Sequence, residues 1–279
     1  MAPAVARTGE TMKSANFSSG DIFDVSGSVV IVTGGASGLG LSIAEVMAAN
    51  DARVLLLDID QARLDECQAR FRAARLALDV AILDVADIPA LQGAIHAAAE
   101  RYGRIDAVFA NAGISAGSGP FTEFGQIANV REEDWNRVLQ INLTAVFATI
   151  QAASIHMKRQ RGGRIVVTSS VAGLRAERHV GYAYVATKAA VVNLVRHAAI
   201  ELAEFGVCVN GIAPGPILTN IAGGKLKDPD IAKPYIANVP LARLGDPDEI
   251  KGLALLLGSR ASSFITGTTI AIDGGMTAW

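Results

Sequence analysis

The chain has 279 residues, which at about 150 residues per domain allows one large domain or two small ones. Hydrophobic residues make up 51% and charged residues 19%, so a large core is available and disorder of the bulk is excluded. The formal net charge is −2 with no block of like charges, which argues against nucleic-acid and membrane-surface partners. The two cysteines, Cys67 and Cys208, match no zinc or redox spacing, so we expect no metal and a cytoplasmic, reducing environment.

Residues 1–24 have no continuous apolar stretch and carry Glu10 and Asp21, so neither a secretory signal nor a transit peptide is predicted. We expect a mobile or tag-like extension there. No linker and no repeat divides the rest, which predicts a single domain over residues 25–279.

The predicted elements alternate short apolar runs with longer Ala-rich segments of helical period, as in repeated βα units. We expect strands at Val29–Thr33, Arg53–Asp58, Val80–Asp84, Ala107–Asn111, Arg164–Ser169, Val207–Ile212 and Thr268–Ile272. We expect helices to begin near Gly38, Gln61, Pro89, Glu132, Gly181 and Asp246. Because the strands have the composition of strands buried on both faces, the pattern predicts a doubly wound α/β fold with a mostly parallel sheet of seven strands.

Three segments stand apart from this alternation. The connections Ser115–Val130 and Ile217–Val239 are long for a compact domain and are candidate lids or pocket walls. Val138–Met157 is uncharged and long enough to cross a bilayer, but it contains Gln140, Asn142, Gln151 and His156. Polar groups are costly in lipid, so we expect a buried or subunit-facing helix and no membrane partner.

The first strand runs into a glycine-rich turn, Thr33 to Gly40, that opens a helix. Glycines allow positive φ and close approach of backbone N–H groups, and a helix N-terminus favours a pyrophosphate. The alternative is a tight turn that only packs a helix on a strand. Asp58 ends the second strand 24 positions after Gly34, near the interval expected for a carboxylate that binds the adenosine ribose.

A carboxylate at Asp58 repels a 2′-phosphate, and neither residues 35–37 nor residues 59–60 supply a countercharge, so the sequence predicts NAD rather than NADP. The alternative is that Asp58 caps the following helix.

Tyr184 and Lys188 are four residues apart at the start of a helical pattern, so their side chains share a face. An ammonium beside a phenol favours the phenolate, lowers the pKa of the tyrosine, and suits it to take a proton from an alcohol. The alternative is a surface lysine covering a packed tyrosine. Tyr182 has Ala186 four residues on and is not a candidate.

Ser170 follows the fifth strand at the sheet edge where open α/β folds bind ligands, and its hydroxyl is placed to hold a substrate oxygen. A serine hydrolase is not supported, because no G-x-S-x-G elbow surrounds it and the histidines show no triad partner. The histidines also lack metal-ligand spacing. His179 precedes Tyr184 and is a candidate for the pocket wall.

From about Val25 to Gly275 the sequence resembles the classical short-chain dehydrogenase/reductase family. The matching motifs, in family order, are Thr33 to Gly40 (TGxxxGxG), Ala110 to Gly113, Asn142, Ser170 before Val-Ala-Gly, Tyr184 to Lys188 (YxxxK), Pro214-Gly215 with Thr219, and Asp273-Gly274-Gly275. The resemblance implies a Rossmann-type fold with helices on both faces of the sheet. It also implies dimers or tetramers built on the helices that contain Asn142 and Tyr184.

By this resemblance the catalytic residues are Asn142, Ser170, Tyr184 and Lys188. Tyr184 is the acid/base, Ser170 polarises the substrate oxygen, Lys188 binds the nicotinamide ribose, and Asn142 kinks its helix and holds a water. The cofactor residues, from the resemblance and the turn together, are Gly34, Ser37, Gly38, Leu39, Gly40, Asp58, Ile59, Asp84, Val85, Asn111, Ala112, Gly113, Tyr184, Lys188, Pro214, Gly215, Ile217 and Thr219.

Two departures from the family pattern concern the substrate side. The interval from Ser170 to Tyr184 is one residue longer than the most frequent one, which raises Ser169 as an alternative; Ser170 is preferred because it precedes Val-Ala-Gly. The stretch after Gly113 is also longer and carries aromatic residues, so we expect a narrowed pocket mouth or one shared with a neighbouring subunit.

The sequence thus predicts an NAD-dependent oxidoreductase that moves hydride between a nicotinamide and a secondary alcohol or ketone of small size. A 3-oxoacyl thioester reductase and a non-enzymatic NAD-binding regulator remain as alternatives. The regulator is disfavoured because all four catalytic residue types are present. The sequence does not identify the alcohol.

Overall fold

The structure is a computed structural model that describes residues 19–115 and 117–278. Its centre is a seven-stranded sheet in the order β3-β2-β1-β4-β5-β6-β7, and each neighbouring pair is parallel. The strands are β1 (Val29–Thr33), β2 (Arg53–Asp58), β3 (Leu78–Ile82), β4 (Ala107–Ala110), β5 (Gly163–Thr168), β6 (Val207–Pro214) and β7 (Thr269–Ile272). The predicted doubly wound α/β fold is confirmed.

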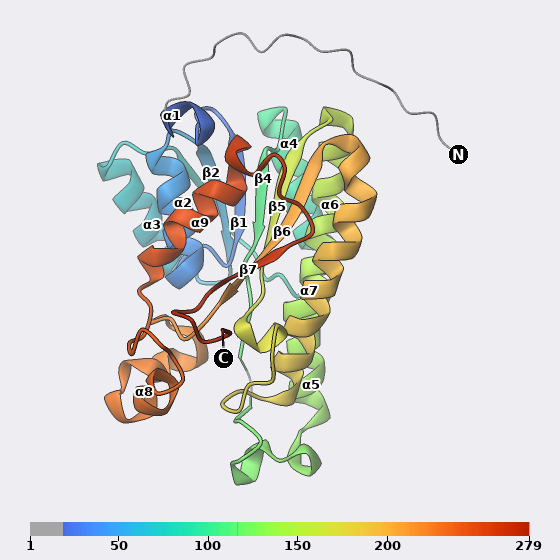
Figure 1. The fold of residues 1–279 in the computed structure, drawn as a ribbon. Helices are drawn as coiled ribbons and strands as arrows, with labels where there is room; N and C mark the ends of the chain where they lie inside the picture. Colours follow the sequence, from blue (N-terminus) through green and yellow to red (C-terminus); the bar gives the residue numbers. More distant parts are fainter. Residues whose placement is uncertain (1–18, 116, 279) are drawn as a thin grey trace.

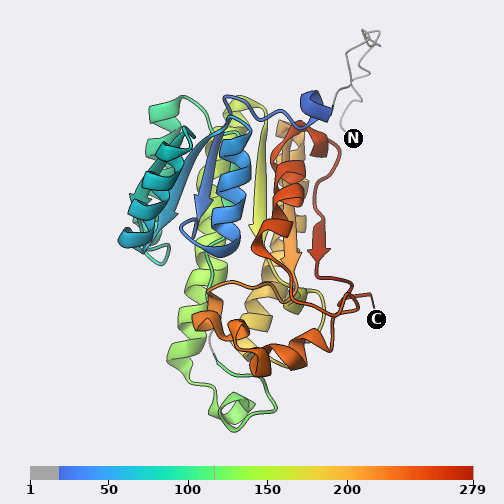
Figure 2. The same cartoon turned by 90° about the vertical axis from the view of Figure 1, so that its left-hand side faces the viewer.

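Helices cover both faces of the sheet (Figures 1 and 2). One face carries α2 (Gly38–Ala49), α3 (Gln61–Ala73) and α9 (Lys251–Gly258); the other carries α4 (Ile88–Tyr102), α6 (Ala145–Gln160) and α7 (Tyr182–Leu202). The remaining helices are α1 (Ser19–Ile22), α5 (Glu132–Leu139) and α8 (Pro229–Ile236). The first eighteen residues of the expected extension lie outside the described residues.

Alternation along the strands divides the core between the two helical layers. In β2, Leu55 and Leu57 pack with α4 and α6, whereas Val54 and Leu56 pack with α2 and α3. Burial on both faces is therefore correct for the central strands. It is wrong for β3 and β7, which are only partly buried because each is an edge strand with one neighbour.

The prediction of the third strand is displaced by two residues. Pairing with β2 begins at Leu78, and β3 ends at Ile82 rather than at Asp84. The chain leaves the sheet after the N–H of Leu83 donates to the carbonyl of Asp58, and the Asp84 side chain accepts from the N–H of Ala86 to form a turn. Asp84 is thereby released from the strand toward the ligand-binding edge.

The last predicted helix begins later than the sequence indicates. Asp246 caps a 3₁₀ turn, Pro247–Ile250, together with Glu249, and the α-helix α9 starts at Lys251. The other helix starts agree within one residue with the expected ones; the side chains of Asp60 and Asp87 cap α3 and α4, and Gly181 precedes α7 without a side-chain cap.

The two long connections both lie beyond the carboxyl ends of the strands, as Figure 2 shows. The segment 117–130 forms two short 3₁₀ turns, Glu123–Gly125 and Ile127–Asn129, and projects below the sheet together with α5. The segment 217–239 contains α8. These segments add walls to the edge where the site residues gather.

The helical run Glu132–Gln160 is long and apolar enough to cross a membrane by length and composition. Half of its most apolar window (50%) is buried inside the protein, where α6 packs against α4 and the sheet. A buried core helix passes the same test, so the expectation of no membrane partner stays a prediction.

Candidate active site

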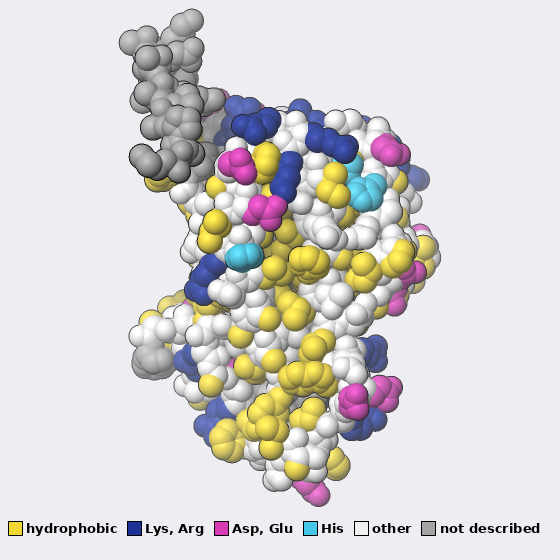
Figure 3. Space-filling view, turned by 90° about the vertical axis from the view of Figure 1, so that its right-hand side faces the viewer, with side chains coloured by type: hydrophobic (Ala, Val, Ile, Leu, Met, Phe, Trp, Pro, Cys, Tyr) yellow, Lys and Arg dark blue, Asp and Glu magenta, His cyan; other side chains and the backbone are white. Residues whose placement is uncertain are grey.

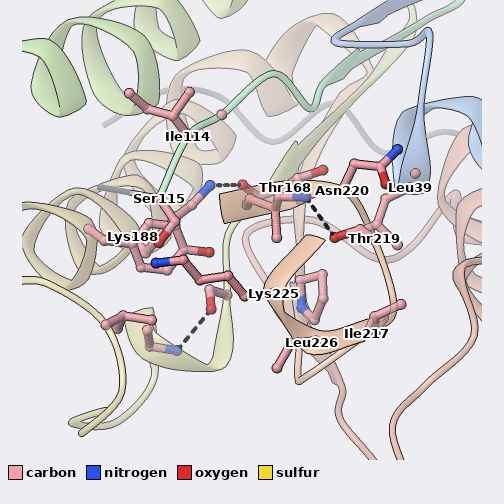
Figure 4. Close-up of a pocket in the computed structure, with 18 of the residues that line it drawn as sticks. Leu39, Ile114, Ser115, Thr168, Lys188, Ile217, Thr219, Asn220, Lys225 and Leu226 are labelled. Carbon is pink, nitrogen blue, oxygen red and sulfur yellow. Dashed lines mark hydrogen bonds between the residues drawn. The ribbon is translucent and has the colours of Figure 1, made fainter. Parts of the chain in front are cut away.

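A cavity of about 1600 Å³ opens at the carboxyl edge of the sheet. Its wall is formed by the glycine turn, the ends of β2, β4, β5 and β6, and the long connections (Figure 4). Of the residues predicted from sequence to be catalytic or cofactor-binding, all except Gly40 and Asn142 line this cavity. The structure therefore places residues predicted from seven separate segments of the sequence around a single cavity.

The glycine turn adopts a conformation that excludes side chains. Gly34 has φ +63°, and a Cβ added there would lie 2.8 Å from the Cα of Ala112. A Cβ on Gly40 would lie 2.2 Å from the carbonyl oxygen of Gly34, which explains why Gly40 packs beneath the turn and does not line the cavity. Ser37 precedes α2 but its side chain does not cap the helix. The first N–H groups of α2 therefore lack the usual side-chain acceptor. This arrangement fits a pyrophosphate.

Asn111 connects three strand ends through its side chain. Its amide nitrogen donates to the carbonyls of Thr33 (3.2 Å) and Gly34 (3.1 Å), and its amide oxygen accepts from the Thr168 hydroxyl at 3.0 Å. The Thr33 hydroxyl accepts in turn from the N–H groups of Asn111 and Ala112, both at 3.1 Å. Asn111 thus fixes the backbone of the floor of the cavity.

Asp58 supports the turn as well as lining the cavity. Its carboxylate accepts from the N–H of Ala36 at 2.9 Å and from that of Asp60 at 3.1 Å. The alternative that Asp58 caps the next helix is wrong, because Asp60 caps α3 by accepting from the N–H of Arg63. The Arg63 guanidinium also pairs with Asp60 and lines the cavity. Sequence reasoning missed this cation, because a residue one turn into a helix returns to the strand end only in three dimensions.

Tyr184 and Lys188 emerge from the first turns of α7 on the same side, and the Lys188 Nζ lies 5.7 Å from the centre of the Tyr184 ring. The Ser170 side chain lies close enough to the Tyr184 hydroxyl to lower the pKa of that phenol, and the Ser170 hydroxyl accepts from the N–H of Ala172 at 3.1 Å. Lys188 donates to the carbonyl of Thr168 at 2.7 Å. A phenol, a hydroxyl and an amine from two elements are therefore gathered at one point.

The protonation of this group differs from the expected one. Burial raises the pKa of Tyr184 above its ordinary value, and the hydrogen bond from Ser170 opposes that rise only in part. Burial also lowers the pKa of Lys188 to about 8. The expected lowering of the tyrosine pKa by the lysine is wrong for the protein alone, because removal from water disfavours the charged forms of both groups.

Asn142 lies in a π-helical turn, Gln140–Thr144, that joins α5 to α6. Its side chain accepts from the N–H of Ile114 at 2.9 Å and donates to the carbonyl of Ile114 at 2.8 Å. It is fully buried and holds the chain that leaves β4. A Cβ on Gly113 would lie 3.3 Å from the Asn142 amide oxygen and 3.6 Å from the Lys188 Nζ, so this glycine keeps the three groups close.

Ser169 and Ser170 have different partners. The Ser169 hydroxyl is buried and donates to the carbonyl of Lys188 at 2.9 Å, which ties β5 to α7. Ser170 lines the cavity and contacts Tyr184. The geometry favours Ser170 as the residue that faces a substrate.

The wall opposite the glycine turn is made from loops that contact each other. Ser118 and Val180 form an isolated antiparallel bridge, and the Arg178 guanidinium lies 4.9 Å from the centre of the Phe121 ring. The rings of His179 and Tyr235 have their centres 4.5 Å apart. The expectation that His179 lines the pocket is confirmed. Tyr235 was missed, since nothing in the sequence of α8 indicates which loop it meets.

The chain is similar in sequence and fold to known proteins. A family model described as enoyl-(acyl carrier protein) reductase matches residues 34–277. Gluconate 5-dehydrogenase of Gluconobacter oxydans is 34% identical over 257 residues, which are 92% of this chain and 97% of that protein. A 3-oxoacyl-acyl-carrier-protein reductase of Thermotoga maritima is 34% identical over 251 residues, 90% of this chain and 98% of that protein.

A solved structure that resembles this one is a gluconate 5-dehydrogenase from Burkholderia cenocepacia in complex with NADP and tartrate. The TM-score is 0.86 at 30% identity, and the match covers 94% of this chain and 100% of that one. The relatives are dehydrogenases and reductases of the same architecture, matched over nearly their whole length.

Proposed function

This chain belongs to the classical short-chain dehydrogenase/reductase family, and on that premise we propose that it is an NAD-dependent enzyme that interconverts a secondary alcohol and a ketone, with Tyr184 as the general acid/base. The bound nicotinamide supplies the hydride acceptor or donor. The protein supplies the position of the substrate, the exclusion of water, and a proton-transfer group.

The cofactor is held by the turn and by the adjoining strand ends. The uncapped N-terminus of α2 and the positive-φ glycines suit the pyrophosphate, and Asp58 suits the adenosine ribose. Thr219 lies over the turn, since a Cβ on Gly38 would be 3.3 Å from its side chain. These residues would hold the dinucleotide, and they line the same cavity as Tyr184.

The proton is exchanged at the Tyr184 hydroxyl. The Ser170 hydroxyl accepts from the N–H of Ala172, and its own proton is left to donate to the phenol or to a substrate oxygen. Lys188, fixed by the Thr168 carbonyl, keeps an amine beside the phenol. Asn142 positions Ile114 and the neighbouring backbone rather than the proton itself. The observation that carries the proposal is that Tyr184, Ser170 and Lys188 line one cavity, with the Lys188 Nζ 5.7 Å from the centre of the Tyr184 ring.

Tyr184→Phe tests the proposal. The change removes only the hydroxyl, so we expect kcat for alcohol oxidation to fall by about 10²–10⁴ while the affinity for NADH changes less than about twofold. Absorbance of NADH measures turnover and its fluorescence measures binding. Tyr182→Phe is the matched control, because Tyr182 is an exposed tyrosine on the same helix. Turnover at the wild-type rate by Tyr184→Phe would contradict the assignment.

The preference for NAD rests on Asp58, whose carboxylate is held by Ala36 and Asp60 at the cavity wall. Arg63 is the opposing consideration, but its guanidinium is neutralised by Asp60. We expect wild-type kcat/KM to favour NAD, and Asp58→Asn to reduce that preference by about tenfold, because the amide does not repel a 2′-phosphate. Asp60→Asn tests Arg63, because it removes the carboxylate that pairs with the guanidinium. A higher kcat/KM with NADP in this variant would identify Arg63 as a ligand of the 2′-phosphate. A wild type that prefers NADP would overturn the assignment.

A 3-oxoacyl thioester reductase is the second candidate, on the strength of the Thermotoga relative. An acidic carrier protein requires a basic docking surface. Arg131, which precedes α5, is paired with Asp134, and Glu132 and Glu133 follow it, so the first turn of α5 is acidic. We therefore place this function behind the oxidation of small alcohols.

We also propose that the chain forms homo-oligomers through α6 and α7. Apolar side chains gather over this part of the surface (Figure 3), and the exposed ones include Phe147, Ile155 and Ile200. Burial of such a patch against a second copy removes apolar area from water. Light scattering after size exclusion should give a dimer or tetramer, and Phe147→Asp with Ile200→Asp should shift the mass toward the monomer.

A further inference from the structure

Two buried polar atoms in the cavity wall have no hydrogen-bond partner. They are Oε2 of Glu177 and Nε2 of His179, and within residues 19–115 and 117–278 no other buried side-chain nitrogen or oxygen shares this condition. Both residues lie in the loop between Ser170 and Tyr184 and line the same cavity as those residues. The unsatisfied atoms are therefore concentrated on the substrate side of the proposed reaction.

Each of the two side chains is fixed in place. The other carboxylate oxygen of Glu177 accepts from the N–H of His179 at 3.3 Å. The His179 ring lies against the Tyr235 ring, and the Tyr235 hydroxyl donates to the His179 carbonyl at 3.4 Å. The bridge between Val180 and Ser118 holds the end of the loop. Fixed side chains can impose a direction on a ligand, whereas mobile ones would find partners in solvent.

A buried polar atom without a partner is costly, and native proteins leave few of them. Burial lowers the pKa of His179, so its imidazole is neutral near pH 7 and its Nε2 can either donate or accept, according to tautomer. The carboxylate of Glu177 accepts only. The charged neighbours lie elsewhere in the wall: Arg178 covers the Phe121 ring, and Lys225 approaches from the segment after β6 (Figure 4).

We propose that Glu177 and His179 are specificity-determining residues that hydrogen-bond the hydroxyl groups of a polyhydroxylated, uncharged alcohol whose neighbouring carbinol reacts at Tyr184. This inference rests on the proposed function and deepens it. A substrate hydroxyl donates a hydrogen bond to Oε2 of Glu177, and a hydroxyl donates to or accepts from Nε2 of His179. Both unpaired atoms then have a hydrogen-bond partner. A simple monoalcohol or a steroid-like ring leaves them unpaired, and a carboxylate meets the charge of Glu177.

Both unpaired atoms are shielded from solvent, so a substrate hydroxyl reaches them only when a neighbouring side chain moves. Tyr235 is one such neighbour, because its ring lies against the His179 ring with the centres 4.5 Å apart and it lines the same cavity.

The test compares substrates on two conservative variants. Galactitol and sorbitol are the polyol probes, 2-hexanol and cyclohexanol the monoalcohol probes, and NAD is the oxidant. His179→Phe keeps a ring against Tyr235 but removes Nε2, and Glu177→Gln keeps the shape but removes the charge. We expect wild-type kcat/KM to favour a polyol, and each variant to lower it for polyols by about 10–100-fold while monoalcohols change less than about threefold.

Matched controls come from the same residue types away from the pair. His197→Phe removes an exposed histidine on α7, and Glu123→Gln removes an exposed carboxylate near the mouth of the cavity. Both should leave every substrate unchanged. D-gluconate adds an opposite expectation: Glu177→Gln should raise kcat/KM for this anion severalfold, since a like charge is removed.

A binding measurement separates this inference from the proposed function. Calorimetric titration of galactitol into Tyr184→Phe protein with NAD present measures the affinity for the polyol. We expect that affinity to fall at least tenfold when His179→Phe is added. An equal loss on all substrates, no loss on any, or a wild type that prefers monoalcohols would overturn the subsite, because the pair would then be structural or satisfied by water. Inactivity of the wild type on every alcohol, with polyol binding that still depends on His179, would overturn the proposed function and leave the subsite standing.

Discussion

On the side of the cavity that carries the glycine turn, Asn111 and Thr33 tie the ends of β1, β4 and β5 together by hydrogen bonds of 3.0–3.2 Å. On the opposite side, the contacts between loops include an isolated bridge, a ring pair, a 3.4 Å hydrogen bond from Tyr235 to His179 and a cation over a ring. The first side is part of the sheet, and the second is attached to it. A change on the first side should therefore disturb binding and folding together, whereas a change on the second should alter substrate choice with a smaller loss of stability.

The largest expected effect comes from adding a single methyl group to the turn. Gly40→Ala places a Cβ against the Gly34 carbonyl, where only backbone can give way. We expect a loss of about 3–5 kcal/mol in the free energy of unfolding and at least a hundredfold weaker binding of NADH. Urea denaturation and NADH fluorescence measure the two quantities.

Gly252→Ala is the control for that change, because nothing lies within 4 Å of the added Cβ and the residue is in α9. It should stabilise the protein by about 0.5–1 kcal/mol. If Gly40→Ala behaved like Gly252→Ala, the turn would not be the rigid side of the comparison.

Lys188 predicts a dependence of stability on pH. Its pKa is about 8 in the folded protein against 10.5 for an exposed lysine. Between these values the unfolded chain holds a proton that the folded chain has released, so the free energy of unfolding should rise with pH, by about 3 kcal/mol across the window. Below pH 8 the burial penalty is fully present.

Lys188→Met should remove this rise, which urea titrations from pH 7.5 to 10.5 would measure. Lys233→Met is an exposed-lysine control on α8 and should keep the wild-type slope. A wild type whose stability is flat over this range would show that the Lys188 amine titrates as it does in water.

Asn111→Ala sharpens the comparison on the rigid side. It removes three hydrogen bonds and leaves the carbonyls of Thr33 and Gly34 without them, so we expect a loss of about 2–3 kcal/mol. Chemical denaturation gives the value, and Thr122→Ala on the loop side, which removes the cap of a short 3₁₀ turn, is the comparison at about 1 kcal/mol. Equal losses at the two positions would remove the distinction between the sides.

The smallest effect is expected at the exposed tip of the loop side. Phe124 is 80% exposed, so Phe124→Ser should change the free energy of unfolding by less than about 0.5 kcal/mol. If the connection that carries Phe124 narrows the mouth of the cavity, the KM of the Phe124→Ser enzyme for bulky alcohols should change. A loss of stability above 1 kcal/mol would show that Phe124 packs against a partner subunit in solution.

The sequence by itself determined the strands, the turn and the spacing of Tyr184 and Lys188, because each depends on local rules: alternation, capping, glycine at positive φ, and the pitch of one helix. It misplaced the end of β3, because pairing with β2 rather than apolar composition decides where a strand stops. It also identified Asp58 as a cavity residue but did not identify Arg63. Arg63 lies one turn into α3, which brings its guanidinium to the same strand end.

Tertiary structure alone decided the environment of those residues. Burial reversed the expected direction of the Tyr184 pKa, and the meeting of His179 with Tyr235 joined segments far apart in the chain. Solvation and long-range contact depend on everything that surrounds a side chain, which no short motif encodes. For this reason the sequence predicted the catalytic residues, whereas the residues that would select a substrate were identified only from the tertiary structure.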